Sequence, residues 1–509
     1  MASVKVSGGG KSVSVEIETG NTLMSAIRKA NVSVSFPCGG KGSCGKCRVK
    51  ASGALSGIQP REEKWLSEEE KTAGVRMACF AEVLGDCEVE IMEKTSGAVI
   101  ENTYTEWNGT LDPLYSEGFG AAFDIGTTTV AARLFSSGFR HPIAVKGELN
   151  KQQTFGADVI SRIVSCSENT VRPQSDLIRK QLSDMLKELC REAGVPEKEV
   201  RFLVICGNTT MMYILFAIDP APLSIAPFTM DQPFGGLFDA KLPGFEGLPC
   251  WVPGCASAYV GADITCSVLA SGMTGMKGNI LLVDAGTNGE MVLSVDGTLR
   301  CCSTAAGPAF EGAGIACGGN ASAGAIDSVL FENGEFSYTT IAGAPARTLC
   351  GSGLIDAVAA LLKAGFITSK GKLKTPGGGD FFFADSGVYL TQKDIRQLQL
   401  AKAAIRAGMD TLIHESGLTY DDVDTIILCG GFGSYMRPAG AEAIGLIPPG
   451  FAEKAIAIGN AAGNGAARIL QSRQQQEEAV RIVNSMNTVE LAASPYFRDQ
   501  YIRRMMFPV

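Results

Sequence analysis

The chain has 509 residues, of which 45% are hydrophobic and 19% charged, and its formal net charge is -8 at pH 7. At roughly 100 to 200 residues per domain, this length predicts about three structural units with cores of their own. The negative balance gives no basic surface for nucleic acid. No segment predicts a signal peptide or a membrane span, so we expect a cytoplasmic protein without a membrane partner. Its 16 cysteines are therefore expected as reduced thiols and metal ligands.

The first part of the chain, residues 1–93, is predicted to be a small domain of short strands around one helix. Apolar and polar residues alternate over residues 13–17, which is typical of a strand. Residues 21–30 predict a helix that begins at a Thr or Asn cap. A closing strand is predicted at residues 87–91, so Cys87 is expected to lie in the core of this domain.

Four cysteines of this domain have a spacing that suits an iron-sulfur cluster. Cys38, Cys44, Cys47 and Cys79 form the pattern C-x5-C-x2-C-x31-C, with the first three in a glycine-rich loop. Thiolates on such a loop can hold a cluster while backbone N–H groups point at its sulfurs. The spacing leaves a structural zinc ion and plain buried thiols open as alternatives. The region resembles the 2Fe-2S ferredoxin domain, which has a β-grasp fold, and this resemblance implies that the four cysteines bind a 2Fe-2S cluster.

Residues 94–118 have no periodic pattern of apolar residues and are predicted to be a linker. After this linker the pattern of apolar residues changes. Apolar strands that end in glycine-rich turns now alternate with helices, which is typical of α/β layers. Two segments, 121–135 and 280–294, share the order of an apolar strand, an Asp, a Gly-Thr turn and a second strand. This shared order indicates a duplication.

The two Asp-Gly-Thr turns are predicted to bind phosphate. Such a turn offers N–H and hydroxyl donors to phosphate oxygens, while its Asp holds a magnesium ion or one of its waters. Ordinary hairpin turns have the same composition, so one turn alone is weak evidence. A third strand ends in two glycines, against which a purine or ribose can lie. The predicted nucleotide contacts are Asp124, Gly126, Thr127, Thr128, Asp284, Gly286, Thr287, Asn288, Gly430 and Gly431.

The order of these three turns resembles the ATPase superfamily of actin, sugar kinases and heat-shock chaperones. The resemblance implies a duplicated, RNase H-like fold with a first lobe at 119–278 and a second lobe at 279–484. It also implies that residues 485–509 return to the first lobe and that ATP binds with Mg²⁺ between the lobes. Two helices, at 257–272 and 459–470, are expected to cross at the hinge, where their small residues permit a close approach.

Several further residues of this part have more than one interpretation. Asp263 is a candidate for orienting the attacking water, with a capping or packing role as the alternative and Asp158 as a rival residue. Glu311 is expected near the ribose or adenine, although ordinary glycine-rich turns have the same composition. Lys402 and Arg406 are expected on the solvated face of a helix.

A 2Fe-2S ferredoxin domain fused to such an ATPase resembles the ATP-dependent reductive activators of corrinoid proteins. Segments 150–163, 207–228, 391–408 and 489–502 also look like that family. The resemblance implies an ATP-driven enzyme that passes one electron from the cluster to cobalt(II) and regenerates cobalt(I). It implies a corrinoid protein of a methyltransferase system as partner and an upstream low-potential electron donor, and it leaves a homodimer open. Members of the family carry an additional domain where this chain has only residues 94–118.

Two other functional classes stay open. A small-molecule kinase with a regulatory cluster would need a substrate base in the cleft, and nothing in the sequence nominates its compound. An ATP-driven electron donor to a non-corrinoid acceptor would share the ATPase fold. Activators of that kind hold a 4Fe-4S cluster at a dimer interface, whereas this chain has a complete set of four cysteines.

Overall fold

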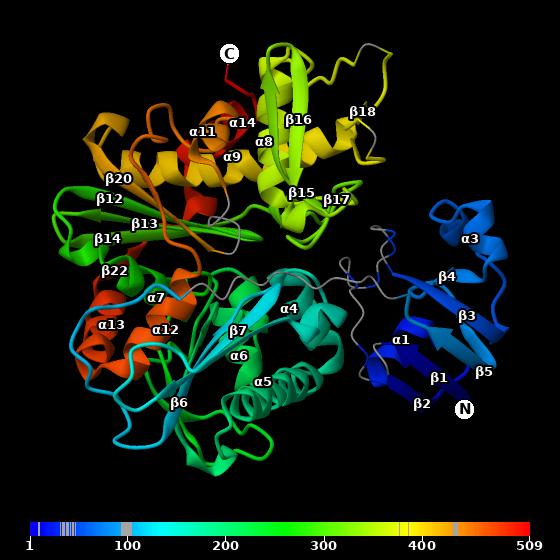
Figure 1. Ribbon diagram of the computed structural model, residues 1–509, viewed down its shortest axis with the longest axis horizontal. Coiled ribbons are helices and arrows are strands. Elements are labelled where there is room, and N and C mark those ends of the chain that lie inside the picture. Colours follow the sequence, from blue (N-terminus) through cyan, green and yellow to red (C-terminus); the bar gives the residue numbers. More distant parts are fainter. Residues whose placement is uncertain are drawn as a thin grey trace.

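The structure of the protein is a computed structural model, and it describes most of residues 1–92 and 104–508. The positions not described are 9–10, 31, 33–35, 37–39, 41, 43–44, 46, 93–103, 376, 385, 431–435 and 509. A small N-terminal domain stands beside a larger body of two lobes (Figure 1). The domain has a hydrophobic cluster of its own, and two large clusters fill the body.

The N-terminal domain is a five-stranded mixed sheet with short helices. Its elements are β1 (Ala2–Gly8), β2 (Lys11–Ile17), α1 (Leu23–Lys29), β3 (Arg48–Leu55), α2 (Pro60–Glu63), α3 (Glu68–Thr72), β4 (Val75–Met77) and β5 (Val83–Glu90). The strand order is β2-β1-β5-β3-β4, and β1 runs parallel to β5. Helix α1 buries Leu23, Ala26 and Ile27 in the core of this domain. Cys87 on β5 is buried there too, which confirms its expected place.

The first lobe is built on a six-stranded sheet. Its elements are β6 (Phe119–Ile125), β7 (Thr129–Ser136), β8 (Ala144–Leu149), η1 (Lys151–Thr154), α4 (Val159–Asn169), α5 (Arg172–Ala193), β9 (Val200–Gly207), α6 (Thr209–Leu215), β10 (Gly236–Asp239), β11 (Pro249–Val252) and α7 (Ala262–Ser271). The strand order is β10-β11-β9-β6-β7-β8. Strand β6 pairs antiparallel with β7 and parallel with β9, so its end lies in the middle of the sheet.

The second lobe repeats this plan, with the strand order β21-β20-β12-β13-β14-β22. Its elements are β12 (Asn279–Ala285), β13 (Asn288–Val295), β14 (Thr298–Ala305), η5 (Pro308–Glu311), β15 (Ala325–Glu332), β16 (Glu335–Thr340), β17 (Thr348–Leu349), α8 (Gly351–Lys363), β18 (Phe381–Phe382), β19 (Tyr389–Leu390), α9 (Gln392–Glu415), β20 (Val423–Cys429), α11 (Pro438–Ala443), β21 (Ala455–Ala457), α12 (Ala461–Gln471), α13 (Arg473–Ser485), β22 (Met486–Thr488) and α14 (Pro495–Arg504). Strand β12 pairs antiparallel with β13 and parallel with β20, as β6 does with β7 and β9. This repeat confirms the predicted duplication.

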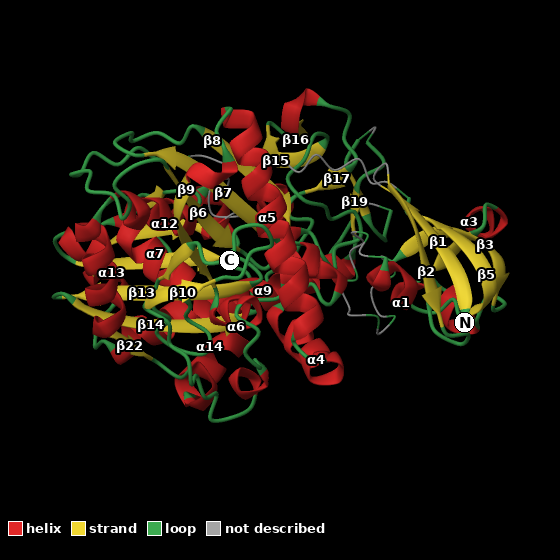
Figure 2. Ribbon diagram, turned by 90° about the horizontal axis from the view of Figure 1, so that it is seen from below, coloured by secondary structure: helices red, strands yellow, loops and turns green. Residues whose placement is uncertain are grey.

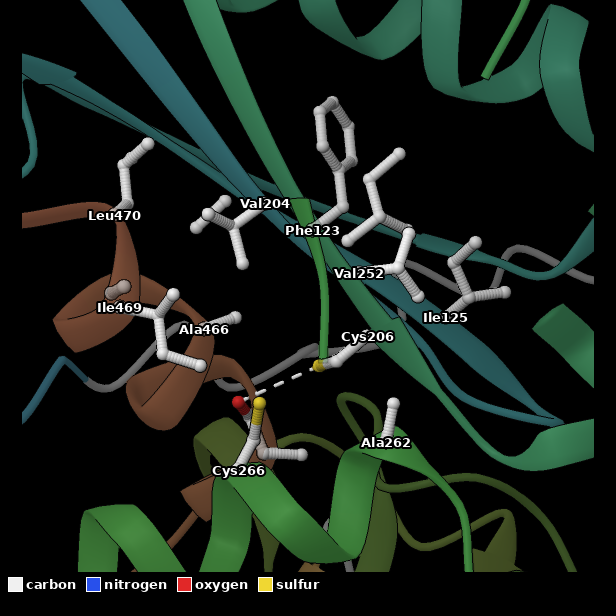
Figure 3. Close-up of a cluster of buried hydrophobic side chains, with 14 of the residues drawn as sticks. Phe123, Ile125, Val204, Cys206, Val252, Ala262, Cys266, Ala466, Ile469 and Leu470 are labelled. Carbon is white, nitrogen blue, oxygen red and sulfur yellow. Dashed lines mark hydrogen bonds between the residues drawn. The ribbon is translucent and has the colours of Figure 1, made fainter. Parts of the chain in front are cut away.

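Helices α12 and α13 pack against the first lobe. Helix α12 lies on β6 and β9 and crosses α7, and Figure 3 shows its Ile469 and Leu470 in one cluster with Val204 of β9. At the crossing, a Cβ atom on Gly465 would stand 2.1 Å from the carbonyl oxygen of Cys266. The expected close crossing of these two helices is therefore present, and a glycine makes it possible.

The described part of the predicted linker, residues 104–118, lies along the end of α12. The Tyr104 hydroxyl donates to Gln471 Oε1 at 3.1 Å, and the Asp112 backbone N–H donates to the Gln471 carbonyl at 3.0 Å. Tyr115 is buried in the core of the first lobe. This part of the linker is therefore packed against the larger body.

The expectation that residues 485–509 return to the first lobe is wrong. Strand β22 runs parallel to β14 in the sheet of the second lobe, with Met486 paired to Leu299. Helix α14 packs along α9, where Arg504 Nε lies 2.6 Å from Asp410 Oδ2. Strand β22 thereby covers the edge of β14, which would otherwise present unpaired backbone groups. The helices that do return to the first lobe are α12 and α13.

Lys402 and Arg406 on α9 are buried, which corrects their expected solvated position. Lys402 Nζ donates to the carbonyl oxygen of Met506 at 2.7 Å. Arg406 Nε lies 2.9 Å from Asp410 Oδ1. Burial, together with the positive charge of Arg406, lowers the pKa of Lys402 to about 7. Lys402 thus holds the C-terminal segment onto the second lobe directly, whereas Arg406 is connected to it only through Asp410, which also binds Arg504.

We expect Gly465→Ala to lower the free energy of unfolding by about 1 to 3 kcal/mol, because the added methyl group meets the backbone of α7. Denaturant unfolding of the whole chain measures this loss. Gly275→Ala is the matched control, since a Cβ atom there would have nothing within 4 Å. Equal stability of Gly465→Ala and the control would contradict the close crossing.

Candidate functional site

The first Asp-Gly-Thr turn connects β6 to β7. Asp124 and Ile125 end β6, and β7 begins at Thr129, so Gly126, Thr127 and Thr128 form the loop between two paired strands. A Cβ atom on Gly126 would stand 2.8 Å from the carbonyl oxygen of Thr129, which explains the glycine. We call residues 126–128 the first phosphate loop.

The carbonyl oxygens of the first phosphate loop are held from behind by residues 150–162. Asn150 Nδ2 donates to the Gly126 carbonyl at 2.8 Å, and Gln153 Nε2 donates to the Thr128 carbonyl at 2.9 Å. Buried Arg162 on α4 donates to the Thr127 carbonyl. In a trans peptide the N–H group points opposite to the carbonyl. Holding the carbonyls on one side therefore turns the donor side of the loop toward the space in front of it.

The second Asp-Gly-Thr turn connects β12 to β13 in the same way, and we call residues 286–288 the second phosphate loop. Asp284 lies on β12, and the Gly286 N–H donates to the Asn288 carbonyl at 2.9 Å. Gly430 follows β20, where a Cβ atom would stand 2.3 Å from Asp284 Oδ1. Gly430 thus makes room for this carboxylate, a reason that the sequence did not indicate. Gly431 lies outside the described residues.

The two loops face one cavity between the lobes. Its wall contains every predicted nucleotide-site residue that the structure describes, namely Asp124, Gly126, Thr127, Thr128, Asp263, Asp284, Gly286, Thr287, Asn288, Glu311 and Gly430. By contrast, the rival Asp158 caps α4, where its carboxylate accepts from the Ser161 N–H at 2.8 Å. Its capping role is therefore the one that the structure shows.

The cavity also contains Asn208 and Asn460, which the sequence did not single out, and Glu290, which ends the second segment predicted to bind phosphate. Asn208 Nδ2 donates to Thr127 Oγ1 at 3.1 Å. Burial raises the pKa of Asp124, and a hydrogen bond from Asn460 opposes part of that rise. Both asparagines cap helices, so a short polar residue before an apolar run is the signal that could have found them. Glu290 lies opposite Asp284 in the β12–β13 register.

Besides that of Glu311, four carboxyl groups lie at this wall, those of Asp124, Asp263, Asp284 and Glu290. Burial, and next the charge of Asp124, raises the pKa of Asp284 to about 6. Burial and the charge of Asp284 raise the pKa of Asp263 to about 8. The pKa of Glu290 also lies well above its usual range because of burial and Asp263. Like charges in such a place must be protonated or neutralised by a cation, so this wall favours a positive ion.

Glu311 joins the two phosphate loops directly. Thr128 of the first loop donates to its Oε2, and Thr287 Oγ1 of the second loop donates to its Oε1 at 2.6 Å. The Glu311 carboxylate lies between the hydroxyls of the two loops, and its expected place near the ribose or adenine stays a prediction. It occupies the donors that phosphate oxygens would use, and it links one lobe to the other.

The cysteine site is described for two of its four members. Cys47 directly precedes β3 and Cys79 follows β4, and pairing of these strands brings the two sulfurs within 3.2 Å. Gly42 and Gly45 have φ of +72° and +65°, and Cβ atoms on them would enter the rings of Phe80 and Trp65. Cys38 and Cys44 lie outside the described residues. Convergent sulfurs in a loop too tight for side chains fit the thiolate set of an iron-sulfur cluster.

Comparison with known proteins connects these sites. Residues 8–84 match the 2Fe-2S iron-sulfur cluster binding domain, residues 119–276 the RACo middle region, and residues 278–509 the C-terminal domain of RACo, described as the ASKHA domain. The corrinoid activation enzyme RamQ of Eubacterium limosum is 34% identical over 422 residues, which cover 76% of this chain and 70% of the relative. The chain belongs to this family of corrinoid activators.

Two further matches agree with this assignment. A [Co(II) methylated amine-specific corrinoid protein] reductase of Methanosarcina barkeri is 24% identical over 428 residues, covering 76% of this chain and 77% of the relative. A solved structure, the reductive activator for corrinoid,iron-sulfur protein, superposes with a TM-score of 0.72 at 29% identity and covers 100% of this chain and 98% of its own. Within the described residues, no helix has the length and apolar character that a membrane span requires.

We expect Glu311→Gln to bind ATP more tightly, by roughly tenfold, equivalent to about 1.4 kcal/mol. The amide removes a negative charge from the place where phosphates would lie. Calorimetric titration of the whole chain with ATP and Mg²⁺ measures this change, and exposed Glu332→Gln is the control. Weaker binding by Glu311→Gln would show that this carboxylate assists the nucleotide.

We expect Asp263→Asn to raise the free energy of unfolding by roughly 1 to 2 kcal/mol above pH 8 and by about half as much at pH 6, midway between the ordinary pKa of an aspartate and its pKa in the folded chain. The pKa of Asp263 is raised to about 8 in the folded chain, so its contribution to stability is lost as the pH rises through that value. Denaturant unfolding without nucleotide or Mg²⁺ tests this difference, with exposed Asp421→Asn as control. The same gain at both pH values would show that the charge of Asp263 is not its cause.

Proposed function

We propose that the protein reductively activates a corrinoid protein in an ATP-dependent reaction. One electron passes to the cobalt(II) form of the partner, which becomes cobalt(I). The observation that carries this proposal is the combination of converging cluster-type cysteines with a two-loop cavity in one chain. Its relatives are named for corrinoid activation and corrinoid protein reduction, which supports the choice of partner.

Cys38, Cys44, Cys47 and Cys79 would hold a 2Fe-2S cluster in the N-terminal domain. When bound, such a cluster supplies electrons one at a time, at a potential of about -400 mV in plant-type ferredoxins. The rings of Phe80 and Trp65 lie against the glycines of the loop. The two described cysteines, Cys47 and Cys79, are buried, and limited access of water to such thiolates affects the potential.

The two phosphate loops would hold the phosphates of ATP through their N–H groups and the hydroxyls of Thr127, Thr128 and Thr287. Asp124 and Asp284 would bind Mg²⁺, either directly or through water. Among the described residues no three acidic, Cys or His side chains converge closely enough to hold a metal alone. This agrees with the usual mode of Mg²⁺, which takes one or two carboxylates together with waters and substrate phosphates.

Asp263 would orient the attacking water and accept its proton at a carboxylate oxygen. It lies at the N-terminus of α7, inside the cavity and close enough to Asp284 and Asp124 for their charges to raise its pKa. A pKa raised to about 8 is suited to proton transfer near neutral pH. Neutralisation of the two aspartates by a cation would lower that pKa again, so the charge of Asp263 would follow the filling of the site.

ATP would supply driving force for an electron transfer that is uphill in potential. For one electron, each ~59 mV of unfavourable potential costs a factor of ten in the equilibrium constant. Closure of the two lobes on nucleotide would be the conformational step, about the crossing of α7 and α12.

The partner would be a corrinoid protein of a methyltransferase system, with a low-potential electron donor upstream, in the cytoplasm. A homodimer would be recognised by its mass in solution.

The test is spectroscopic. The chain is reduced without oxygen and mixed with a cobalt(II) corrinoid protein of the same source, and cobalt(I) absorption is followed with and without ATP and Mg²⁺. We expect cobalt(I) only with nucleotide. Cys47→Ser should abolish the formation of cobalt(I) while ATP still binds. Asp284→Asn should also abolish the formation of cobalt(I), while the visible absorption of the N-terminal domain is kept. Cys87→Ala is the control, because this buried cysteine lies outside the four-cysteine set.

Other outcomes would decide between the alternatives. Consumption of ATP against a small metabolite, with no cobalt(I) from any corrinoid protein, would favour the kinase. ATP-dependent reduction of a non-corrinoid acceptor alone would favour the other class of electron donor. Cobalt(I) formed equally well without nucleotide would contradict the role given to the cavity.

A further inference from the structure

The N-terminal domain contacts the first lobe through one arginine of α1. Arg28 Nε donates to the carbonyl oxygen of Thr154, at the end of η1, at 2.8 Å. Its guanidinium lies 5.8 Å from the ring centre of Phe36 in its own domain and 5.5 Å from that of Phe155 in the lobe. The Phe36 N–H also donates to the carbonyl of Gln153, at 3.4 Å. In both views α1 is on the side of the domain that faces the larger body (Figures 1 and 2).

A groove opens beside Arg28 between the domain and the lobe, and its wall includes Lys29, Lys151, Leu177 and Lys180. Burial lowers the pKa of Arg28, and the charge of Glu168 opposes that change. The guanidinium is thus partly removed from water and is stabilised by the carbonyl and the two rings.

The turn that Arg28 contacts is also the turn that holds the first phosphate loop. Asn150 caps η1 by accepting from the Gln152 N–H at 2.9 Å, and its Nδ2 donates to the Gly126 carbonyl at 2.8 Å. Gln153 donates through its side chain to the Thr128 carbonyl, while its own carbonyl accepts from the N-terminal domain. A shift of the first phosphate loop would therefore be transmitted to both contacts of that domain.

We propose that Arg28 is a positioning residue, and that it couples the position of the N-terminal domain to the nucleotide site through η1. The identity of the two ligands, ATP and the cluster, rests on the function proposed above. In the sequence, Phe36 lies two residues before Cys38, so the predicted cluster loop follows this contact directly along the chain. Coupling of this kind is reciprocal: nucleotide changes the affinity of the domain for the lobe, and docking changes the affinity for nucleotide by the same factor.

The test is amide hydrogen exchange on the full chain, with and without a non-hydrolysable ATP analogue and Mg²⁺. In the unchanged protein the analogue should alter exchange in residues 126–130 and 150–155, and also in α1, there by about fivefold or more. Arg28→Ala should lose the response of α1 and keep that of residues 126–130. Lys29→Ala is the matched control, since its Nζ donates to the Glu16 carbonyl within the domain, and it should keep both responses.

Two further variants test whether the effect of Arg28→Ala is more than a loss of folding. Arg28→Lys keeps the charge but not the planar group between the rings, so it should show a reduced response of α1. Phe155→Leu removes the ring on the side of the lobe and should weaken the same response. Unchanged melting temperature and visible absorption show that each variant is folded and loaded.

Three outcomes can be told apart. A response of α1 that persists in Arg28→Ala overturns the proposal, as does an α1 that never responds while residues 126–130 do. Loss of the α1 response in Arg28→Ala, accompanied by a changed affinity for the analogue, supports it. If residues 126–130 do not respond in the unchanged protein, the nucleotide site itself is contradicted, and the proposed function fails with it.

Discussion

The structure depends on holding negative carboxyl groups from two lobes at one cavity wall. Asp124 and Asp284 lie on equivalent central strands, and each is paired across its sheet with a cysteine, Cys206 and Cys429 respectively. Bringing these two strand ends together is unfavourable in the absence of a cation, as the raised pKa of Asp284 shows. The rest of the fold must supply the free energy that opposes this repulsion. It does so through apolar packing well away from the cavity.

The packing that holds the lobes together is concentrated at the crossing of α7 and α12. Helix α12 comes from the second half of the chain and yet completes the core of the first lobe, so the two lobes cannot separate without exposing apolar surface. Gly465 brings the helices into backbone contact, which leaves rotation about the crossing as the easier motion. Glu311 adds a polar link across the cavity, between hydroxyls that nucleotide phosphates would otherwise use. A ligand that displaces this carboxylate would therefore act directly on the relation between the lobes.

The sequence predicted those parts of the fold and the site whose chemistry is local. Asp124 and Asp284 were recognisable because strand, carboxylate and Gly-Thr turn are consecutive in the chain. Asn208 and Asn460 were missed because each reaches the cavity as the cap of a helix that lies far from the two turns in the sequence. The place of residues 485–509 was wrong for a similar reason, since pairing of β22 with β14 joins segments almost 190 residues apart and leaves no periodic signal. Glu311 was found, but its partners were visible only in three dimensions.

The contact at Arg28 suits a domain that has to deliver electrons to a partner outside the chain. A hydrogen bond from a charged group contributes about 1.5 to 3 kcal/mol, and a cation–π contact about 0.5 to 2 kcal/mol. Interactions of this total strength can be formed or broken by the differential binding of a nucleotide, whereas a broad apolar interface would be too strong to be opened in this way. Because the first phosphate loop is held by the same turn that Arg28 contacts, nucleotide would act on this contact through the backbone of residues 150–154. A cluster-bearing domain held in this way can be fixed in one nucleotide state and free to approach its acceptor in another.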